Sequence, residues 1–308
     1  MYKNNNTWKP RVSVVMCTYN GEKFLHEQID SILAQSYPIA EFLIFDDNSS
    51  DTTSEIIESY AREYPLIQFH KNPVNLGYNL NFQQALKTAQ SEVIAIADQD
   101  DMWHQHKIER MIAVWDSAAP IIHCDSQRFT HTVNKNNPNK RWYRRFKGTD
   151  TKQLFVYNTV SGHAMLLRKS FLPMILPFEK NIYYDWWVAL VASCNGGVDY
   201  IDETLVYQRV HGHNASIERG VKRNNQFINY REVVSTHLKK FITAPNLKVE
   251  DKKLAAELQG CLSDLDSPKK RRKLFLLIFK NRKIIFYYKK RKVELFSHIK
   301  YALRLAFY

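Results

Sequence analysis

An apolar run that ends in three carboxylates constrains this chain more than any other stretch. Residues 94–103 read IAIADQDDMW, so Asp98, Asp100 and Asp101 directly follow a short series of small and β-branched apolar residues. Such a run is typical of a buried strand, and carboxylates crowded at its end repel one another unless a cation or a basic group lies among them. Side chains at positions i and i+2 of an extended chain point the same way, so Asp98 and Asp100 can face one site.

Two interpretations of this acidic cluster are open. Oxygen ligands suit Mg²⁺ or Mn²⁺, and such ions complete their coordination with water and substrate phosphate. Alternatively, Asp101 caps a helix over residues 103–115, where the helix dipole stabilises a carboxylate. A cap explains one aspartate but not three, so the pattern favours a metal site.

Strand-like and helix-like segments alternate on either side of this cluster. Strands are predicted over residues 12–17, 41–45, 66–69 and 92–97, with helices after the first three of them, such as the one over 79–89. The alternation indicates an α/β fold with a mostly parallel, Rossmann-like sheet flanked by helices. In such sheets ligands bind beyond the carboxyl ends of the strands. The residues expected along that edge are 18–20, 46–48, 75–77 and 98–101.

Two common phosphate-binding motifs are absent from the sequence. No GxGxxG follows the first predicted strand, and GxxxxGK[ST] occurs nowhere. Carboxylates with a metal are then expected to hold phosphate, and a nucleoside diphosphate could place its base and ribose against Tyr19 and Asp47. For Asp47 a turn role is an equally good interpretation, because Asx-rich segments form turns regardless of function.

Several segments together resemble a known family. VSVVMCTYNG, FDDNSSDTT, NLGYNLNF and ADQDDMW are similar, in order and spacing, to the nucleotide-sugar-binding half of family-2 glycosyltransferases of the GT-A fold. The resemblance covers about the first 115 residues and implies that Asp98-Gln99-Asp100 is the DxD motif, with Asp100 as metal ligand. The string DQDD before an apolar residue and Trp is similar to a rhamnosyltransferase-like branch. The donor contacts expected from these segments are Thr18, Tyr19, Asn20, Asp47, Asn75, Gly77, Asp98 and Gln99.

A second acidic position is Asp185, within YYDWW at the start of an apolar helical run. Desolvation beside indole rings raises the pKa of a carboxylate toward that of a general base, and Trp186 and Trp187 could stack on an acceptor sugar. From the residues alone, a helix cap with two core tryptophans is the favoured interpretation. The resemblance reverses it, because family members place their catalytic base at this acid.

Two later segments add residues to the implied site. LVYQRVHGHN, which begins in a strand predicted over residues 205–210, resembles the family's Arg-x-His element, implying Arg209 as a donor contact and His211 as a metal ligand. A histidine ligand favours Mn²⁺ without excluding Mg²⁺. Asp125, in a strand predicted over residues 121–129, is expected to contact the acceptor.

The net charge of +13 belongs to one segment. Residues 268–308 hold 14 Lys and Arg against the single acid Glu294, whereas the rest of the chain carries 30 basic and 30 acidic side chains. Helices are predicted near residues 226–242, 247–262 and from 268 onward, and the one over 292–306 is amphipathic. We expect 268–308 to bind anionic membrane, with docking of its apolar face on the protein itself or on a second subunit as the alternative. That face comprises Leu295, Phe296, Ile299, Ala302, Leu303 and Ala306.

The sequence therefore predicts an inverting, metal-dependent glycosyltransferase with a C-terminal helical, basic extension. Its donor would be a nucleotide sugar of the dTDP-rhamnose or UDP-hexose type, and its acceptor a polysaccharide or glycolipid in bacterial surface glycan synthesis. The expected division is a nucleotide-sugar-binding half at residues 1–117, an acceptor-binding half at 118–219 and a membrane-associating region at 220–308. The implied mechanism has Asp185 deprotonate the acceptor hydroxyl.

The expected location is the cytoplasm, peripheral at the inner face of the cell membrane. The first residues lack a signal peptide's apolar core, no apolar run reaches the ~20 residues of a spanning helix, and the four cysteines show no CxxC pairing. One rival is a sugar-nucleotide nucleotidyltransferase, which would need a Gly-rich, Arg-containing loop where TYNGEK stands. The other is a nucleic-acid-binding protein that uses the basic tail. We expect no nucleic-acid partner.

Overall fold

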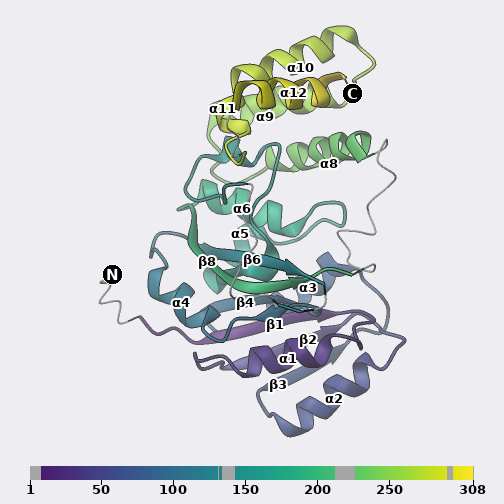
Figure 1. Cartoon of the computed structure of the whole chain (residues 1–308), viewed down its shortest axis with the longest axis vertical. Coiled ribbons are helices and arrows are strands. Elements are labelled where there is room, and N and C mark those ends of the chain that lie inside the picture. Colours follow the sequence, from purple (N-terminus) through teal and green to yellow (C-terminus); the bar gives the residue numbers. More distant parts are fainter. Residues whose placement is uncertain (1–7, 131, 134–142, 212–225, 290–293, 308) are drawn as a thin grey trace. The chain divides into compact units, whose positions relative to one another are not determined.

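The computed structural model describes residues 8–130, 132–133, 143–211, 226–289 and 294–307 (Figure 1). The chain divides into two compact units, each built from segments that are distant in sequence. The first comprises Met1–Asn139, Val160–Lys180 and Val198–Val210, and the second Lys140–Thr159, Asn181–Gly197 and His211–Tyr308. The functional division at residues 117 and 219 stays a prediction.

The described residues of the first unit form an eight-stranded sheet with the order β3-β2-β1-β4-β7-β6-β8-β5. Strand β1 pairs in parallel with β2 and β4, β2 with β3, and β6 with β8, whereas β7 runs antiparallel to β4 and β6, and β5 to β8. The expected α/β fold with a mostly parallel sheet is confirmed. The strands are β1 (Val12–Thr18), β2 (Glu41–Asp46), β3 (Ile67–Lys71), β4 (Val93–Asp98), β5 (Met102–Trp103), β6 (Ile121–Phe129), β7 (Met165–Arg168) and β8 (Val198–Arg209).

Helices cover the sheet because its central strands are apolar on both faces. Val14 and Met16 of β1 belong to one core cluster with Leu25, Ile57 and Ile108 from three helices, while Val15, which points the opposite way, is also fully buried. The helices of this unit are α1 (Leu25–Leu33), α2 (Thr53–Glu63), α3 (Tyr78–Thr88), α4 (Lys107–Val114) and α5 (Leu172–Ile175), with short 3₁₀ turns η2 (Gly162–Ala164) and η3 (Lys169–Phe171).

The helix expected over residues 103–115 begins later than the sequence suggests. Trp103 pairs with Val206 of β8 as part of the two-residue strand β5, and α4 starts at Lys107. Asp101 is therefore not the cap of that helix, whose N-cap residue is His106. The capping interpretation of the acidic cluster is wrong.

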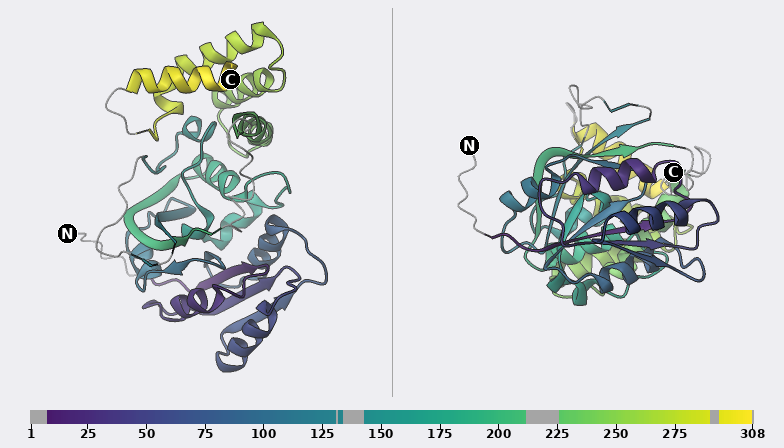
Figure 2. Two further views of the ribbon diagram at one scale, coloured as in Figure 1. Left: turned by 45° about the vertical axis from the view of Figure 1, so that its right-hand side comes forward. Right: turned by 90° about the horizontal axis from the view of Figure 1, so that it is seen from below.

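The second unit is mainly helical. Its elements are η1 (Thr151–Leu154), α6 (Tyr184–Cys194), α8 (Gln226–Phe241), α9 (Val249–Leu262), α10 (Pro268–Lys280), α11 (Arg282–Ile285) and α12 (Glu294–Phe307). Helices α8 and α9 confirm the helices expected near residues 226–242 and 247–262. Helices α10 and α12 lie side by side in the views of Figures 1 and 2. None of the described helices is long and apolar enough to cross a bilayer.

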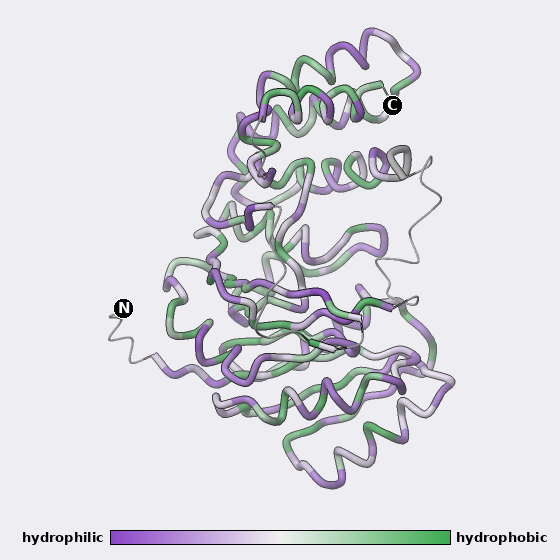
Figure 3. The backbone as a smooth tube through the Cα atoms, in the orientation of Figure 1, coloured by the Kyte–Doolittle hydropathy of each residue, from purple (hydrophilic) through white to green (hydrophobic). Residues whose placement is uncertain are grey.

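The apolar face that the sequence predicts for α12 is partly buried and partly exposed. Ala302 and Ala306 are fully buried within the unit, whereas Leu295, Phe296 and Leu303 are 49%, 74% and 36% exposed. A polar first half of α10 is followed by an apolar second half, whereas apolar and polar residues alternate along α12 (Figure 3). Part of the face is thus docked on the protein itself, as the alternative interpretation held, and part remains exposed.

His237 of α8 lies in the core of the second unit as a neutral imidazole. Its Nε2 accepts a hydrogen bond from the backbone N–H of Tyr183 at 2.9 Å, so Nδ1 carries the proton, which it donates to the carbonyl oxygen of Val233 at 2.7 Å. The ring stacks on Trp186 with centroids 4.5 Å apart. Burial lowers the pKa of His237 to about 4, because an imidazolium would lose its hydration there.

We expect acid to destabilise the protein through this histidine. Between pH 6.5 and 4 the unfolded chain binds a proton at His237 that the folded chain does not, so stability present above pH 6.5 is lost as the pH falls toward 4. The loss at pH 5 should be roughly 2 kcal/mol. Urea unfolding at pH 7 and pH 5 should show a smaller difference for His237→Gln than for the wild type. His26→Gln, at an exposed position of α1, is the control, and an unchanged difference in His237→Gln would contradict this assignment.

Candidate functional site

The register of three parallel strands brings the predicted polar segments to one edge of the sheet. Thr18 at the end of β1 pairs with Asp46 at the end of β2, and Cys17 pairs with Asp98 at the end of β4. The Thr18 hydroxyl also donates to Asp46 Oδ1 at 2.9 Å. The turns that follow β1, β2 and β4 therefore start side by side, as the sheet topology predicts.

The turn after β1 is held by the loop after β2. Asn20, at φ 47°, accepts the Ser50 N–H on its side-chain oxygen at 2.9 Å, and its own N–H donates to the Ser49 hydroxyl at 2.8 Å. Asn20 thus fixes the backbone, whereas the neighbouring Tyr19 side chain is 50% exposed. Tyr19 and Asn20 are both exposed, and Tyr19 is the one of the two whose side chain these hydrogen bonds do not use.

Asp47 organises the loop that contains Asn75 and Gly77. Its Oδ1 accepts from the Asn72 side-chain amide at 2.9 Å and from the Leu76 N–H at 2.8 Å, and its Oδ2 accepts from the Gly77 N–H at 2.8 Å. Asn75 Oδ1 also accepts from that N–H, at 3.1 Å, and Gly77 adopts φ 81°, which suits glycine. These contacts fit the turn role that the sequence left open for Asp47, and its donor contact stays a prediction.

The acidic turn after β4 is tied to β8. The Arg209 N–H donates to Asp101 Oδ1 at 3.1 Å, and its Nε donates to the Asp100 carbonyl oxygen at 3.2 Å. The same guanidinium pairs with Glu27 and lies over the Phe24 ring at 4.7 Å. Arg209 therefore holds the acidic turn in place, and a donor contact from it stays a prediction.

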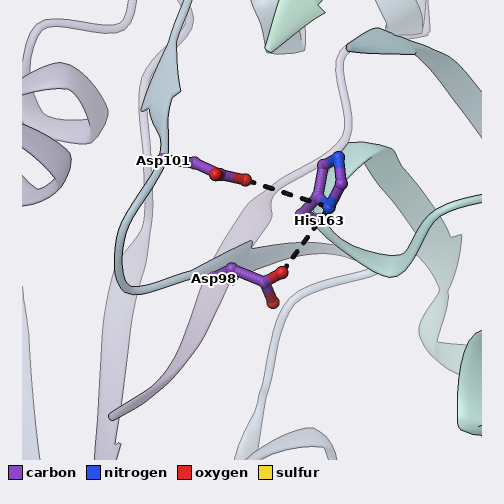
Figure 4. Close-up of side chains that lie close together, drawn as sticks. All are labelled: Asp98, Asp101 and His163. Carbon is purple, nitrogen blue, oxygen red and sulfur yellow. Dashed lines mark ion pairs between the residues drawn. The ribbon is translucent and has the colours of Figure 1, made fainter. Parts of the chain in front are cut away.

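The first unit brings His163 of η2 to this acidic turn. Its Nδ1 lies 3.5 Å from Asp98 Oδ2 and 3.8 Å from Asp101 Oδ2 (Figure 4). One ligand atom from each of the three residues lies within 4.8 Å of the others. Asp98 is partly exposed, whereas Asp101 and His163 are 1% and 5% exposed. The cluster thus has two buried members and one at the surface.

The electrostatics of this cluster fit a bound cation. Burial raises the pKa of Asp101 well above its usual range, and the carboxylates of Asp98 and Asp100 raise it further. Asp101 Oδ2 and His163 Nε2 are buried without a hydrogen-bond partner among the described residues. Two carboxylates and an imidazole are a donor set that Mn²⁺ accepts. The alternative is that His163 only pairs with the two carboxylates and binds no ion.

Lys107 supports His163 from inside the protein. Its Nζ donates to the His163 carbonyl oxygen at 2.9 Å and lies 3.3 Å from the centre of the Trp103 ring. Burial lowers the pKa of Lys107 to about 7, although Asp101 and Asp98 act in the opposite direction. Sequence reasoning missed both His163 and Lys107. The signal for Lys107 was present, because four-residue spacing to Met111 places it on the apolar face of α4.

The candidate metal ligands in the structure differ from the expected pair, Asp100 and His211. Asp100 lies in the same acidic turn, but the residues whose ligand atoms converge are Asp98, Asp101 and His163. His211 belongs to the second unit, directly before residues 212–225, which lie outside the described part of the chain. A ligand role for either residue stays a prediction.

The tryptophans beside Asp185 are core residues, which corrects their expected contact with the acceptor. Trp186 and Trp187 are 3% and 4% exposed. Trp186 donates its Nε1–H to the Leu154 carbonyl oxygen at 2.6 Å, and Lys240 Nζ lies 4.7 Å from the centre of the Trp187 ring. Asp185 itself lies in the first turn of α6 and is partly exposed.

Asp125 needs the same correction. It lies in β6, pairs with Thr204 of β8 at an irregularity in the register, and has no exposed surface. A side chain enclosed in this way cannot reach an acceptor while the sheet stays intact.

The arrangement so far is an α/β protein whose strand ends carry an Asp-Asp-His cluster, and comparison with known proteins gives the family. The model for glycosyl transferase family 2 matches residues 13–174. An uncharacterized glycosyltransferase of Methanocaldococcus jannaschii is 29% identical over 237 residues, which is 75% of this chain and 80% of the relative. The putative teichuronic acid biosynthesis glycosyltransferase TuaG of Bacillus subtilis is 34% identical over 105 residues, 34% of this chain and 42% of its own. The chain belongs to glycosyl transferase family 2.

Solved structures give the same fold. TarS of S. aureus in complex with UDP-GlcNAc aligns with a TM-score of 0.61 at 16% identity, covering 96% of this chain and 89% of that one. The mannosyltransferase PcManGT from Pyrobaculum calidifontis, in complex with GDP-Man and Mn²⁺, aligns with a TM-score of 0.58 at 16% identity, covering 98% and 82%. The expected GT-A fold is confirmed, and the protein is a glycosyltransferase.

We expect His163→Phe, which keeps a ring but removes both nitrogens, to weaken Mn²⁺ binding at least about tenfold. The physical reason is the loss of one of three converging ligands, since even residues that merely orient a ligand contribute roughly 10- to 100-fold. Calorimetric titration of Mn²⁺ measures this, with His26→Phe as the matched exposed control. Unchanged affinity would show that His163 is not a ligand of the ion. Loss in Asp100→Ala but not in His163→Phe would move the ion to Asp100.

Proposed function

We propose that this glycosyltransferase moves a sugar from a nucleotide-sugar donor to a glycan or glycolipid acceptor in bacterial surface glycan synthesis. The observation that carries the proposal is the Asp98, Asp101 and His163 cluster at the carboxyl ends of parallel strands, beside the exposed Tyr19. Similar proteins support it, because TarS is in complex with UDP-GlcNAc, PcManGT is in complex with GDP-Man and Mn²⁺, and TuaG is a putative teichuronic acid biosynthesis glycosyltransferase. The DQDD string, which is similar to a rhamnosyltransferase-like branch, makes dTDP-rhamnose the first donor to test, with UDP-hexoses next.

The mechanism that we propose is a single displacement with inversion. Asp98, Asp101 and His163, with Asp100 beside them, would hold Mn²⁺ or Mg²⁺, which neutralises charge on the nucleoside diphosphate. Asp185 would accept the proton of the acceptor hydroxyl as its oxygen attacks the anomeric carbon. The assignment of Asp185 comes from its position in the family pattern, and its place at the partly exposed start of α6 is compatible with it.

The donor class can be tested with a panel of dTDP-rhamnose, UDP-hexoses and GDP-mannose, by following the release of nucleoside diphosphate with Mn²⁺ present. For the donor that reacts, Asp185→Asn should lower the rate of transfer by ~10²-fold or more, because general base catalysis contributes on that order. The affinity for the nucleoside diphosphate should stay unchanged. Asp202→Asn, on an exposed position of β8, is the control. Wild-type rates in Asp185→Asn would leave this residue a structural role at the helix start.

We further propose that the C-terminal helices hold the enzyme at the cytoplasmic face of an anionic membrane. Phe296, Ile299 and Leu303 of α12 line a groove together with the basic Lys300 and Arg304. Apolar side chains flanked by cations match a lipid surface, where the former enter the headgroup boundary and the latter contact anionic lipid. Three further basic residues of this segment, Lys290, Arg291 and Lys292, lie outside the described part of the chain.

Replacing Phe296 and Leu303 together by Glu should lower binding to anionic liposomes at least about tenfold. Burying each of these side chains contributes roughly 1.5–3 kcal/mol, and the new carboxylates would be repelled by anionic lipid. Flotation of the full chain measures this, and Val249→Glu on α9, at a position that is 82% exposed, is the matched control. Unchanged flotation would show that this face does not contact lipid, and a smaller mass in light scattering would assign it to a second copy.

A further inference from the structure

Gln99, the middle residue of the DQD string, pairs with the backbone of Tyr19 in both directions. Its Oε1 accepts from the Tyr19 N–H at 2.9 Å, and its Nε2 donates to the Tyr19 carbonyl oxygen at 3.0 Å. Strand β1 ends at Thr18, one residue before Tyr19. The side-chain amide of Gln99 thus takes the place of a strand partner for the Tyr19 backbone. Both polar atoms of Gln99 are engaged with the protein rather than directed at a ligand.

This pairing depends on the absence of a side chain at Gly21. A Cβ atom there would lie 2.3 Å from Gln99 Oε1 and 2.7 Å from its Cδ, far inside van der Waals contact. The φ angle of Gly21 is not positive, and its N–H donates to the Thr53 hydroxyl at 2.8 Å. An alanine at this position is therefore compatible with the backbone, and the group that it displaces is the mobile end of the Gln99 side chain.

The pairing joins two turns with different expected tasks. Gln99 lies between Asp98 and Asp100 in the acidic turn, while Tyr19 carries the half-exposed ring in the turn after β1. Asp98 is fixed from the other side, because its carbonyl oxygen accepts from the buried Gln28 side chain at 2.7 Å. The Tyr19 turn is thus attached to a rigid support.

We propose that Gln99 is a positioning residue that holds the Tyr19 turn against the acidic turn, and so presets the Tyr19 ring for the nucleoside of a nucleoside diphosphate. This inference rests on the proposed function. Without the two hydrogen bonds the turn must be ordered when the ligand binds, and that cost appears as weaker binding. Two hydrogen bonds of ordinary strength correspond to about a tenfold change in affinity.

The test compares Gln99→Ala, Gly21→Ala and the double variant in the full chain. Calorimetry with UDP, dTDP and GDP, each with Mn²⁺, should show about tenfold weaker binding of the preferred nucleotide for either single variant. The double variant should bind no more weakly than the single ones, since alanine at position 99 vacates the space that a Cβ at position 21 needs. Gln68→Ala, at an exposed position of β3, is the control and should bind as the wild type does.

A second measurement separates positioning from a general loss of structure. The affinity for Mn²⁺ alone should stay at the wild-type value in both single variants, because the ligand atoms of the cluster are untouched, and thermal unfolding should remain one cooperative transition. Gln99→Met, which keeps the length of the side chain without its amide, should behave as Gln99→Ala.

Three results would overturn the inference. Unchanged nucleotide affinity in the single variants, or additive losses in the double variant, would show that the pairing does not preset Tyr19, while the proposed function would stand. A wild-type protein that binds none of the three nucleotides would remove the proposed function and this inference with it.

Discussion

Three carboxylates within residues 98–101 repel one another, and several elements of the first unit contribute partners to the one that is buried. Asp101 is almost fully buried, where an isolated carboxylate would be strongly disfavoured. The Arg209 N–H, the His163 ring and the buried Lys107 approach it from three different elements. Each partner is distant in sequence, so the acidic turn cannot adopt this arrangement until β8, η2 and α4 have packed. The burial of one carboxylate thus couples the site to the completed fold.

Most polar side chains at the strand ends hold the protein rather than a ligand. Asp46 accepts from Thr18 and from the Ser49 N–H, Asp47 fixes the loop before α3, and Asn20 fixes the turn after β1. The Tyr19 ring, which is half exposed, and the partly exposed Asp98 are among the side chains here that a ligand could contact. A site of this kind is rigid because its supporting residues have locked partners, which lowers the ordering cost of binding.

The alternation of strands and helices was sufficient to predict the fold, because period and turn chemistry are local properties. Strand β6 falls on the predicted residues 121–129, and the parallel register follows from topology. The partners of the acidic turn could not be predicted, because His163 lies more than sixty residues from Asp98 and nothing local reports that distance. Asp185 and the two tryptophans show a different limit. Helix α6 is buried nearly all round. An acid beside aromatic residues is therefore as typical of the start of a core helix as of a sugar-binding site.

The C-terminal helix shows why an amphipathic pattern alone leaves the partner open. The helical period places six apolar residues of α12 on one face. The small and the large residues of that face differ in burial. Ala302 and Ala306, which are small, allow close packing within the second unit, whereas Phe296 and Leu303 stay exposed beside Lys300 and Arg304. Internal packing uses His298 and Leu305 as well as the two alanines, all of which are buried. Phe296, which is 74% exposed, lies outside that packing. The proposed contact with anionic lipid would use both its apolar area and the neighbouring positive charges.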